Sequence, residues 1–294
     1  MGAIEAASAA AAFVEEPLTA AEAEAALPLS AEAGWNQTAA DWRFMLGQGR
    51  GVGVRDASGR WMGSAIALPL GQELSWIGMV LVAKDARRRG IGTRLLRHAI
   101  DIVRDAERIP SLDATELGRS VYLPLGFRDL YAVSRLRVEV SVPAVPPPPG
   151  CTVRPLTPAD LPAVAAFDAP RSAMERAHVL AYLLGQAPAQ AFVAESGGRI
   201  AGYVLGRPGR TAFQVGPVVA DESEVALVLV SLALSRLTGP VLLDVPDEQA
   251  CLRTFLDGAA AARQRGFIRM TLGAPPPGLD RSVAVFALAG PELG

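Results

Sequence analysis

The chain repeats itself at a nearly constant offset, and this repeat limits the possible folds more than any other feature of the sequence. The two members of each matching pair are separated by 138 to 140 residues. In chain order the pairs are Glu16–Glu22 with Arg154–Asp160, Val54–Gly63 with Val193–Gly202, Trp76–Val80 with Gln214–Val218, and Gly126-Phe127 with Gly266-Phe267. A repeat of this length predicts two copies of one fold, and 294 residues are about the length of two domains.

A proline-rich run separates the copies. Val142–Gly150 contains five prolines, which cannot donate to a strand ladder and favour an extended chain. We therefore expect an N-terminal domain over residues 1–141, a linker over 142–150 and a C-terminal domain over 151–294.

Composition excludes several classes of protein. Half of the residues are hydrophobic, which is too apolar for a disordered chain. The formal net charge of −2 gives no reason to expect a nucleic acid or an anionic membrane as partner. The two cysteines, Cys151 and Cys251, fit neither a metal site nor a disulfide scaffold.

Two further patterns bear on location. The longest apolar stretches, such as Val225–Leu234, are far shorter than the ~20 residues of a membrane span. The alanine-rich start, residues 1–12, carries Glu5 where a secretory signal has positive charge, and favours a frayed or helical terminus. We expect a cytoplasmic protein without a membrane segment.

Each copy alternates strands and helices. Ser58-Gly59 and Gly197-Gly198 lie between apolar runs and predict hairpin turns. Other expected elements are a buried strand over 79–83, an amphipathic helix over 93–107, a short strand over 112–115, and a helix over 118–125 that Gly126 ends. This order predicts an α/β unit with a mixed sheet.

A basic turn with two glycines joins the strand at 79–83 to the helix at 93–107. A helix N-terminus offers unpaired N–H groups to an anion. Gly90 and Gly92 remove the Cβ atoms that would hold a diphosphate away, and Arg87, Arg88 and Arg89 add positive charge. The turn predicts a cofactor that carries phosphate.

Two common phosphate loops do not fit this turn. A P-loop ends in Gly-Lys-Ser/Thr, and a dinucleotide fingerprint has a third glycine where Leu95 stands. An exposed arginine-rich turn without a ligand remains an alternative interpretation.

The pattern Arg87-x-x-Gly90-x-Gly92 resembles the pyrophosphate signature of the GCN5-related N-acetyltransferases (GNAT). In that family a later helix carries a tyrosine, four residues before Gly-Phe, as Tyr122 precedes Gly126-Phe127 here. The resemblance covers both halves, and segments such as Gly34–Thr38 and Phe286–Gly294 are similar to the tandem YitH/HolE-like group. It implies an α/β fold of two tandem GNAT-like domains. Each would be a mixed, mostly antiparallel sheet flanked by helices, with a splayed pair of parallel strands.

The resemblance also implies an acetyl-CoA-dependent N-acetyltransferase without a metal. The pantetheine would bind Met79, Val80, Leu81 and Val82, and the pyrophosphate would bind the turn of Arg87, Arg88, Arg89, Gly90, Ile91, Gly92 and Thr93. A primary amine of a small molecule or peptide would attack the thioester directly. A backbone N–H near Val80 would polarise the thioester carbonyl, and Tyr122 would protonate the departing thiolate.

The general base is less clearly marked. Glu73, Asp113 and Glu116 are candidates, and Asp113 ranks first because a lone acid in an apolar strand needs a partner or a function. A structural hydrogen-bonding role is the alternative. Trp35, Asn36 and Gln37 fall where the family's early helices wall the acceptor site.

The second copy lacks the basic turn. Val219–Glu224 stands in its place with three acids and no glycine pair, and Ala262 stands four residues before Gly266 where a tyrosine is expected. We expect this copy to bind no CoA and to serve as structure or as part of the acceptor cleft.

Two rival functions stay open at this point. One is a non-catalytic acyl-CoA-binding or regulatory module, and the other, from tandem architecture alone, is mycothiol-synthase-like acetylation of a thiol-sugar precursor. The sequence also leaves open a homo-oligomer.

Overall fold

The computed structural model describes residues 14–139 and 142–294, and its thirteen strands join into one sheet. Residues 1–12, for which we expected a frayed or helical terminus, lie outside the described residues. Strands of the first half are β1 Glu15–Leu18, β2 Arg50–Arg55, β3 Trp61–Pro69, β4 Leu74–Val82, β5 Ile109–Ala114 and β6 Arg128–Val138. Those of the second are β7 Cys151–Pro155, β8 Phe192–Ser196, β9 Arg199–Arg207, β10 Phe213–Ala220, β11 Val241–Pro246, β12 Ala262–Thr271 and β13 Val285–Ala287.

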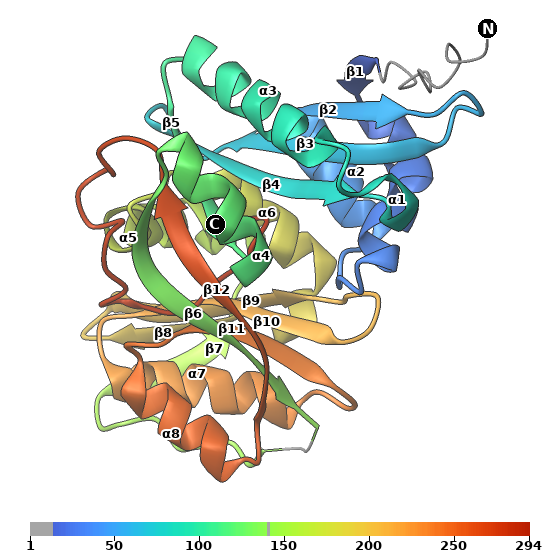
Figure 1. Cartoon of the computed structure of the whole chain (residues 1–294). Helices are drawn as coiled ribbons and strands as arrows, with labels where there is room; N and C mark the ends of the chain where they lie inside the picture. Colours follow the sequence, from blue (N-terminus) through green and yellow to red (C-terminus); the bar gives the residue numbers. More distant parts are fainter. Residues whose placement is uncertain (1–13, 140–141) are drawn as a thin grey trace, which may run out of the picture.

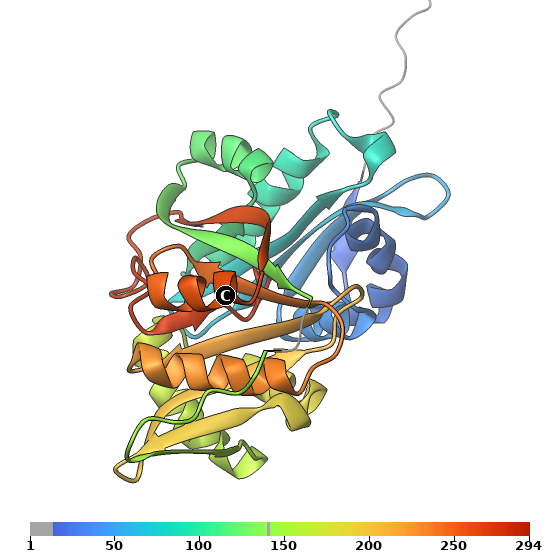
Figure 2. The same cartoon turned by 90° about the horizontal axis from the view of Figure 1, so that it is seen from below.

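Helices cover both faces of each half of the sheet (Figure 1 and Figure 2). They are α1 Ala23–Glu32, α2 Ala39–Gln48, α3 Ile91–Asp105, α4 Glu116–Tyr122, α5 Leu161–Ser172, α6 Ala177–Gln186, α7 Ser223–Ser235 and α8 Ala250–Gly258. Among them none is long and apolar enough to cross a bilayer. Helix α3 packs on β2, β3 and β4, and α7 packs in the same way on β8, β9 and β10.

The strand order has the symmetry of the repeat. It runs β1-β2-β3-β4-β5-β12-β6-β11-β10-β9-β8-β7. Strands β1 to β6 correspond in order to β7 to β12, and corresponding strands lie at equal distances from the centre of the sheet. Strand β12 of the second half lies between β5 and β6 of the first, and β6 in turn pairs with β11. The two halves have thus exchanged their sixth strands, β6 and β12, which cross in Figure 1.

The predicted fold class is confirmed. Along this order only β4–β5 and β10–β11 are parallel, and the other pairs are antiparallel. Both predicted hairpins form, between β2 and β3 and between β8 and β9. The helix expected over 93–107 begins two residues earlier, at Ile91, because Gly90 takes a left-handed φ of 77° and starts it there.

One match within the repeat is wrong. Gly126 ends the turn after α4 with a φ of 94°, whereas Gly266 and Phe267 lie inside β12 and pair with β6. The glycines therefore have different roles, and the two Gly-Phe pairs are not equivalent positions of the fold.

Two buried ion pairs join the exchanged strands to their new neighbours. Asp113 on β5 lies opposite Arg269 on β12, with its oxygens 3.0 and 2.9 Å from the guanidinium nitrogens. Asp244 on β11 lies opposite Arg135 on β6 in the same bidentate arrangement, at 2.7 Å for both bonds. Because the same pair occurs in both copies, we interpret it as a lock on the exchanged strand.

This arrangement argues against Asp113 as the base. Its side chain is 0% exposed, and both oxygens already accept from Arg269. Burial raises the pKa of the Asp113 carboxyl, while the adjacent Arg269 opposes that rise. A carboxylate held in this way fits the structural role that the sequence left as its alternative, although Asp113 also lines the cavity described below.

Asp113→Ala is expected to lower the free energy of unfolding by about 3–5 kcal/mol, because it leaves Arg269 buried without a counter-ion. Urea denaturation measures the change. Asp85→Ala is the control, because Asp85 pairs with Arg60 on the surface and its loss should change stability little. The double variant Asp113→Leu, Arg269→Met should recover most of the lost stability. If Asp113→Ala is as stable as the wild type, the Asp113–Arg269 pair does not stabilise the exchanged strand.

Candidate active site

The parallel strands β4 and β5 part soon after they begin. They pair only over Leu74–Trp76 and Ile109–Ser111. Farther along β4, Met79 has a φ of 53° and the register with β3 shifts, while Ser64 Oγ donates to the Met79 carbonyl at 2.7 Å. The bulge and the splay leave a gap between two strands of the sheet.

A cavity of about 1160 Å³ begins in this gap. Its wall includes every residue expected to hold the cofactor apart from Arg89: Met79, Val80, Leu81, Val82, Arg87, Arg88, Gly90, Ile91, Gly92 and Thr93. Strand β12 supplies another part of the wall through residues 265–268, so the second half of the chain helps to enclose the first half's site.

The N-terminus of α3 faces this cavity. Gly90 is the N-cap, and a Cβ added to it would meet no atom within 4 Å, whereas one added to Gly92 would lie 3.3 Å from Val82. Arg87 donates from Nε to the Val82 carbonyl at 3.1 Å, which ties the turn back to β4. The first amides of a helix lack partners within it, so this open turn fits a phosphate group.

Tyr122 lies at the end of α4 and lines the same cavity. Its ring packs on Phe127 with ring centroids 5.9 Å apart. Burial raises the pKa of its phenol to about 12. The phenol therefore stays protonated at physiological pH and can donate its proton.

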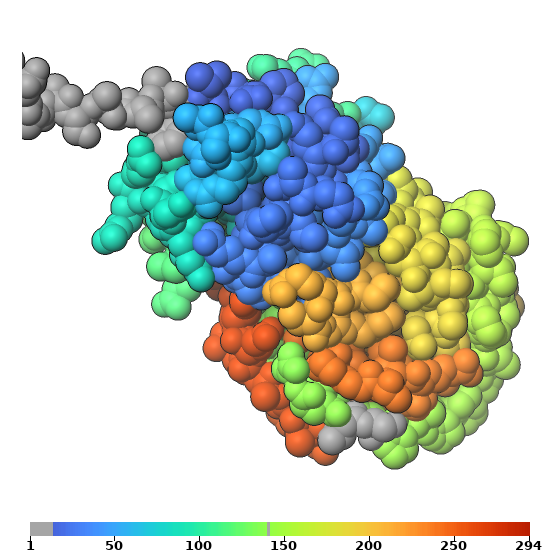
Figure 3. Space-filling view, turned by 90° about the vertical axis from the view of Figure 1, so that its right-hand side faces the viewer, coloured from blue at the N-terminus to red at the C-terminus, as the bar shows by residue number. Residues whose placement is uncertain are grey.

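The expected acceptor residues divide into two groups. Trp35 and Gln37 line the cavity. Asn36 instead joins the halves: its Nδ2 donates to the Ala212 carbonyl at 3.0 Å, and its Oδ1 accepts from the Thr211 and Ala212 amides at 2.9 and 3.1 Å. In Figure 3 the blue part of the first half lies directly against the light-orange segment around residue 210.

The two other candidate bases lie in different surroundings. Glu116, at the start of α4, lines the cavity and is exposed. Glu73, just before β4, is also exposed but lies outside the cavity wall. Of these two carboxylates, Glu116 is therefore the one that the fold brings to the site.

The corresponding gap in the second half is filled by protein. Strands β10 and β11 pair only over 213–214 and 241–242, and beyond this point β13 pairs with β10. The Leu288 amide donates to the Asp244 carbonyl at 2.9 Å. A Cβ on Gly216 would lie 1.9 Å from the Leu288 carbonyl oxygen, so the C-terminal segment occupies this space closely.

From there the C-terminal segment continues to the first half's cavity. Trp76 Nε1 donates to the Pro291 carbonyl at 2.8 Å, and the Glu292 Cα lies 3.3 Å from the position of a Cβ on Gly78. Pro291 and Glu292 both line the cavity. No local pattern in the sequence indicates this place for Glu292, because the contact depends on where the tail passes in three dimensions.

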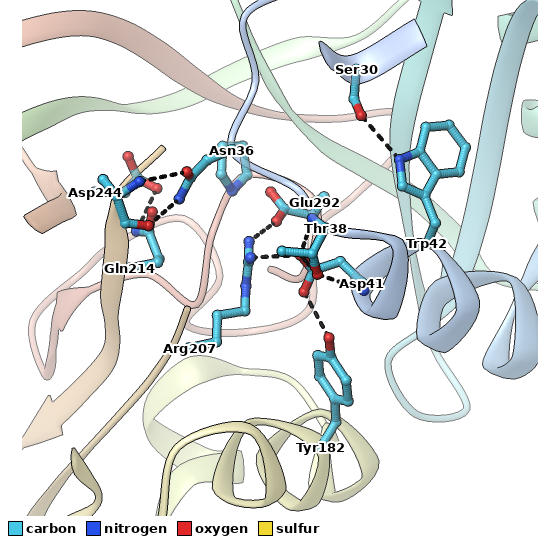
Figure 4. A network of polar contacts seen from close by, with 12 residues as sticks. Ser30, Asn36, Thr38, Asp41, Trp42, Tyr182, Arg207, Gln214, Asp244 and Glu292 are labelled. Atoms are coloured by element: carbon cyan, nitrogen blue, oxygen red, sulfur yellow. Dashed lines mark hydrogen bonds and ion pairs between the residues drawn. The ribbon is translucent and has the colours of Figure 1, made fainter. Parts of the chain in front are cut away.

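A buried polar cluster holds Glu292 in place (Figure 4). Arg207 of β9 forms an ion pair with Glu292 and a second one with Asp41 of α2, the latter at 2.8 Å. Tyr182 donates its hydroxyl to Asp41 at 2.7 Å. The cluster therefore joins three elements and the tail at the boundary between the halves.

A splayed parallel pair, with an open helix N-terminus and a half-buried tyrosine lining the cavity that begins in the splay, defines an acyltransferase of the GNAT type. Family profiles agree with this class. The profile described as "Acetyltransferase (GNAT) family" matches residues 19–127, and "Acetyltransferase (GNAT) domain" matches 164–286. The chain belongs to the GNAT N-acetyltransferases and carries two of their domains in tandem.

Three similar proteins give the scale of relatedness. The uncharacterized N-acetyltransferase YitH of Bacillus subtilis is 26% identical over 78% of this chain and 81% of its own, which makes it a distant homologue. A putative acetyltransferase from Pyrococcus horikoshii has a TM-score of 0.77 at 18% identity, with 96% of each chain covered. A tandem GNAT protein from the clavulanic acid biosynthesis pathway has a TM-score of 0.64 at 17% identity, with 89% of this chain and 99% of that one covered.

The tyrosines should resist titration in the folded protein. Burial raises the pKa of Tyr122, Tyr131, Tyr182 and Tyr203, the four tyrosines of the chain. A phenol whose pKa is higher in the folded than in the unfolded state gives stability that is complete below about pH 10 and is lost as the pH rises further. Phenolate absorbance should thus appear late and together with unfolding, whereas in concentrated guanidinium it should appear near pH 10. Titration of all four near pH 10 in a folded protein would contradict this.

Proposed function

We propose that the protein transfers acetyl from acetyl-CoA to a primary amine of a small molecule or peptide. The observation that carries the proposal is the continuous cavity from the glycine turn at 87–93, along the splayed part of β4, to Tyr122. The pyrophosphate would lie on the α3 N-terminus, where the glycines leave room and Arg87 and Arg88 supply charge. The pantetheine would follow Met79–Val82.

The residues of the chain serve three steps in this proposal. The bulge at Met79 turns the backbone of β4, and an N–H near Val80 polarises the thioester carbonyl. The amine attacks that carbonyl directly, without a covalent enzyme intermediate. Tyr122 gives its proton to the departing thiolate.

We propose that the units follow the repeat. Residues 1–141 would carry the donor site, 142–150 would link the units, and 151–294 would complete the wall of the cavity. The filling of the second gap by β13 supports a single donor site in each chain.

Gly90→Glu should weaken acetyl-CoA binding by about two orders of magnitude or more, because it places a carboxylate where the pyrophosphate is expected. Isothermal titration with acetyl-CoA measures this. The matched control is Gly90→Asn, which must adopt the same left-handed φ but adds no charge, and asparagine tolerates that conformation. Equal affinity for acetyl-CoA in the wild type and in Gly90→Glu would show that the pyrophosphate does not bind at this turn.

Tyr122→Phe should lower kcat about 10²- to 10⁴-fold, the usual range for loss of a general acid, while acetyl-CoA affinity stays the same. Thiol release with a panel of primary amines gives kcat, and calorimetry gives the affinity. Unchanged turnover in Tyr122→Phe would exclude it as the acid. Tight acetyl-CoA binding by the wild type without turnover of any amine would favour a non-catalytic acyl-CoA-binding module.

A further inference from the structure

We propose that Gln37 and Glu292 form the subsite for the acceptor's ammonium group, and that Glu292 takes the proton that the amine must lose before attack. This deepens the proposed function and rests on it. The subsite combines a residue from the first half with one from the C-terminal tail.

Two buried acceptor oxygens lack partners, and both belong to residues that line the cavity. Gln37 Oε1 and Glu292 Oε2 are buried and have no hydrogen bond among the described residues. The two side chains belong to residues that are only 3% exposed, and both line the cavity. A buried acceptor without a donor has lost its water without gaining a partner, so both oxygens fit a ligand that brings N–H groups.

The charges around Glu292 are not fully balanced. The single guanidinium of Arg207 is shared by the carboxylates of Asp41 and Glu292. In the two buried pairs that lock β12 and β6, by contrast, each carboxylate has a guanidinium of its own. The shared arrangement leaves a negative charge only partly compensated, which favours a cationic ligand over a neutral one.

Glu292 also lies close to the expected path of the donor. It packs against Gly78, next to Met79, where the pantetheine segment of β4 begins. Tyr122 lines the same cavity. An amine held by Gln37 and Glu292 would therefore approach the thioester from within the cavity that holds the donor.

The surroundings of Glu292 suit a proton acceptor. Burial raises the pKa of its carboxyl, and the charge of Asp41 raises it further. The charges of Arg207 and Arg135 and a hydrogen bond from the Gln37 side chain lower it. Tyr182, which donates to Asp41, is the remaining titratable group of the cluster.

Atoms and charges balance in the proposed reaction. Glu292 takes one proton from the ammonium, and the free amine forms the C–N bond to the thioester carbon. The C–S bond breaks with its electron pair on sulfur, and the thiolate takes the proton of Tyr122. The nitrogen then releases its second proton, which restores the Tyr122 phenol, and Glu292 returns its proton to solvent. The products are the acetamide, CoA thiol and one proton.

A binding experiment tests the subsite without turnover. The full-length protein, free and saturated with CoA, is titrated with n-butylammonium and with 1-butanol, its uncharged analogue of similar size. We expect butylammonium to bind at least about tenfold more tightly than butanol in both forms. Gln37→Leu and Glu292→Gln should each reduce that preference by about tenfold or more. Equal binding of the two probes, or a preference that both variants keep, would overturn the subsite.

A kinetic experiment tests the proton transfer with any amine that the wild type acetylates. Glu292→Gln should lower kcat about 100-fold or more and remove the acid limb of the pH profile, with acetyl-CoA affinity unchanged. Asp41→Asn is the matched control, because it perturbs the other partner of Arg207 and lies outside the cavity wall. This control should keep the acid limb but move it to lower pH, because the charge of Asp41 raises the pKa of Glu292.

The outcomes separate the two proposals. If Glu292→Gln keeps wild-type kcat and its acid limb, Glu292 is not the base. If Glu292→Gln and Asp41→Asn both lose activity because they unfold, which a lower melting temperature would show, the folded wild type decides. A preference of the wild type for butylammonium over butanol supports the subsite, and equal binding of the two probes overturns it. If acetyl-CoA does not bind, the proposed function is wrong. The titration of the free protein with butylammonium and butanol would still test the ammonium subsite.

Discussion

The exchange of β6 and β12 is the constraint on which the rest of the structure depends. The fifth strand of each copy has one neighbour in its own copy and takes its second neighbour from the other copy, and a bidentate arginine–aspartate pair fixes each of these exchanged contacts. Because a buried carboxylate or guanidinium is costly without its partner, the pairs also favour one register. The two halves are therefore a single folded body with one continuous sheet.

This exchange explains why the site draws on both halves. The donor turn, β4 and α4 come from the first copy, while β12 and the tail complete the wall. The second copy has the same splay, but β13 fills it and then leads the chain to Gly78. One segment thus closes a gap in one copy and supplies a carboxylate to the cavity in the other.

Much of this architecture could be predicted from the sequence because the relevant signals are local. Turn glycines, apolar periodicity and the basic turn at 87–93 each depend on neighbouring residues, so the hairpins, α3 and an α/β unit with a mixed sheet followed from them. The tandem arrangement came from the repeat, and the splayed parallel pair came from the family resemblance. The strand exchange did not, since β5 and β12 are about 150 residues apart in the chain and no local pattern specifies their pairing. For the same reason the sequence does not indicate that Asp113 pairs with Arg269. It also does not indicate that Asn36 contacts the second half at Ala212, or that Glu292 reaches the cavity.

The place of β12 in the sheet also affects synthesis of the protein. Strand β5 is complete at residue 114, yet its neighbour begins only at residue 262. On the ribosome, the native partners of the β5 edge and of Asp113 are therefore not available until about half of the chain has been added after β5. Such an edge invites association with other chains, and pausing between the copies would prolong that exposure.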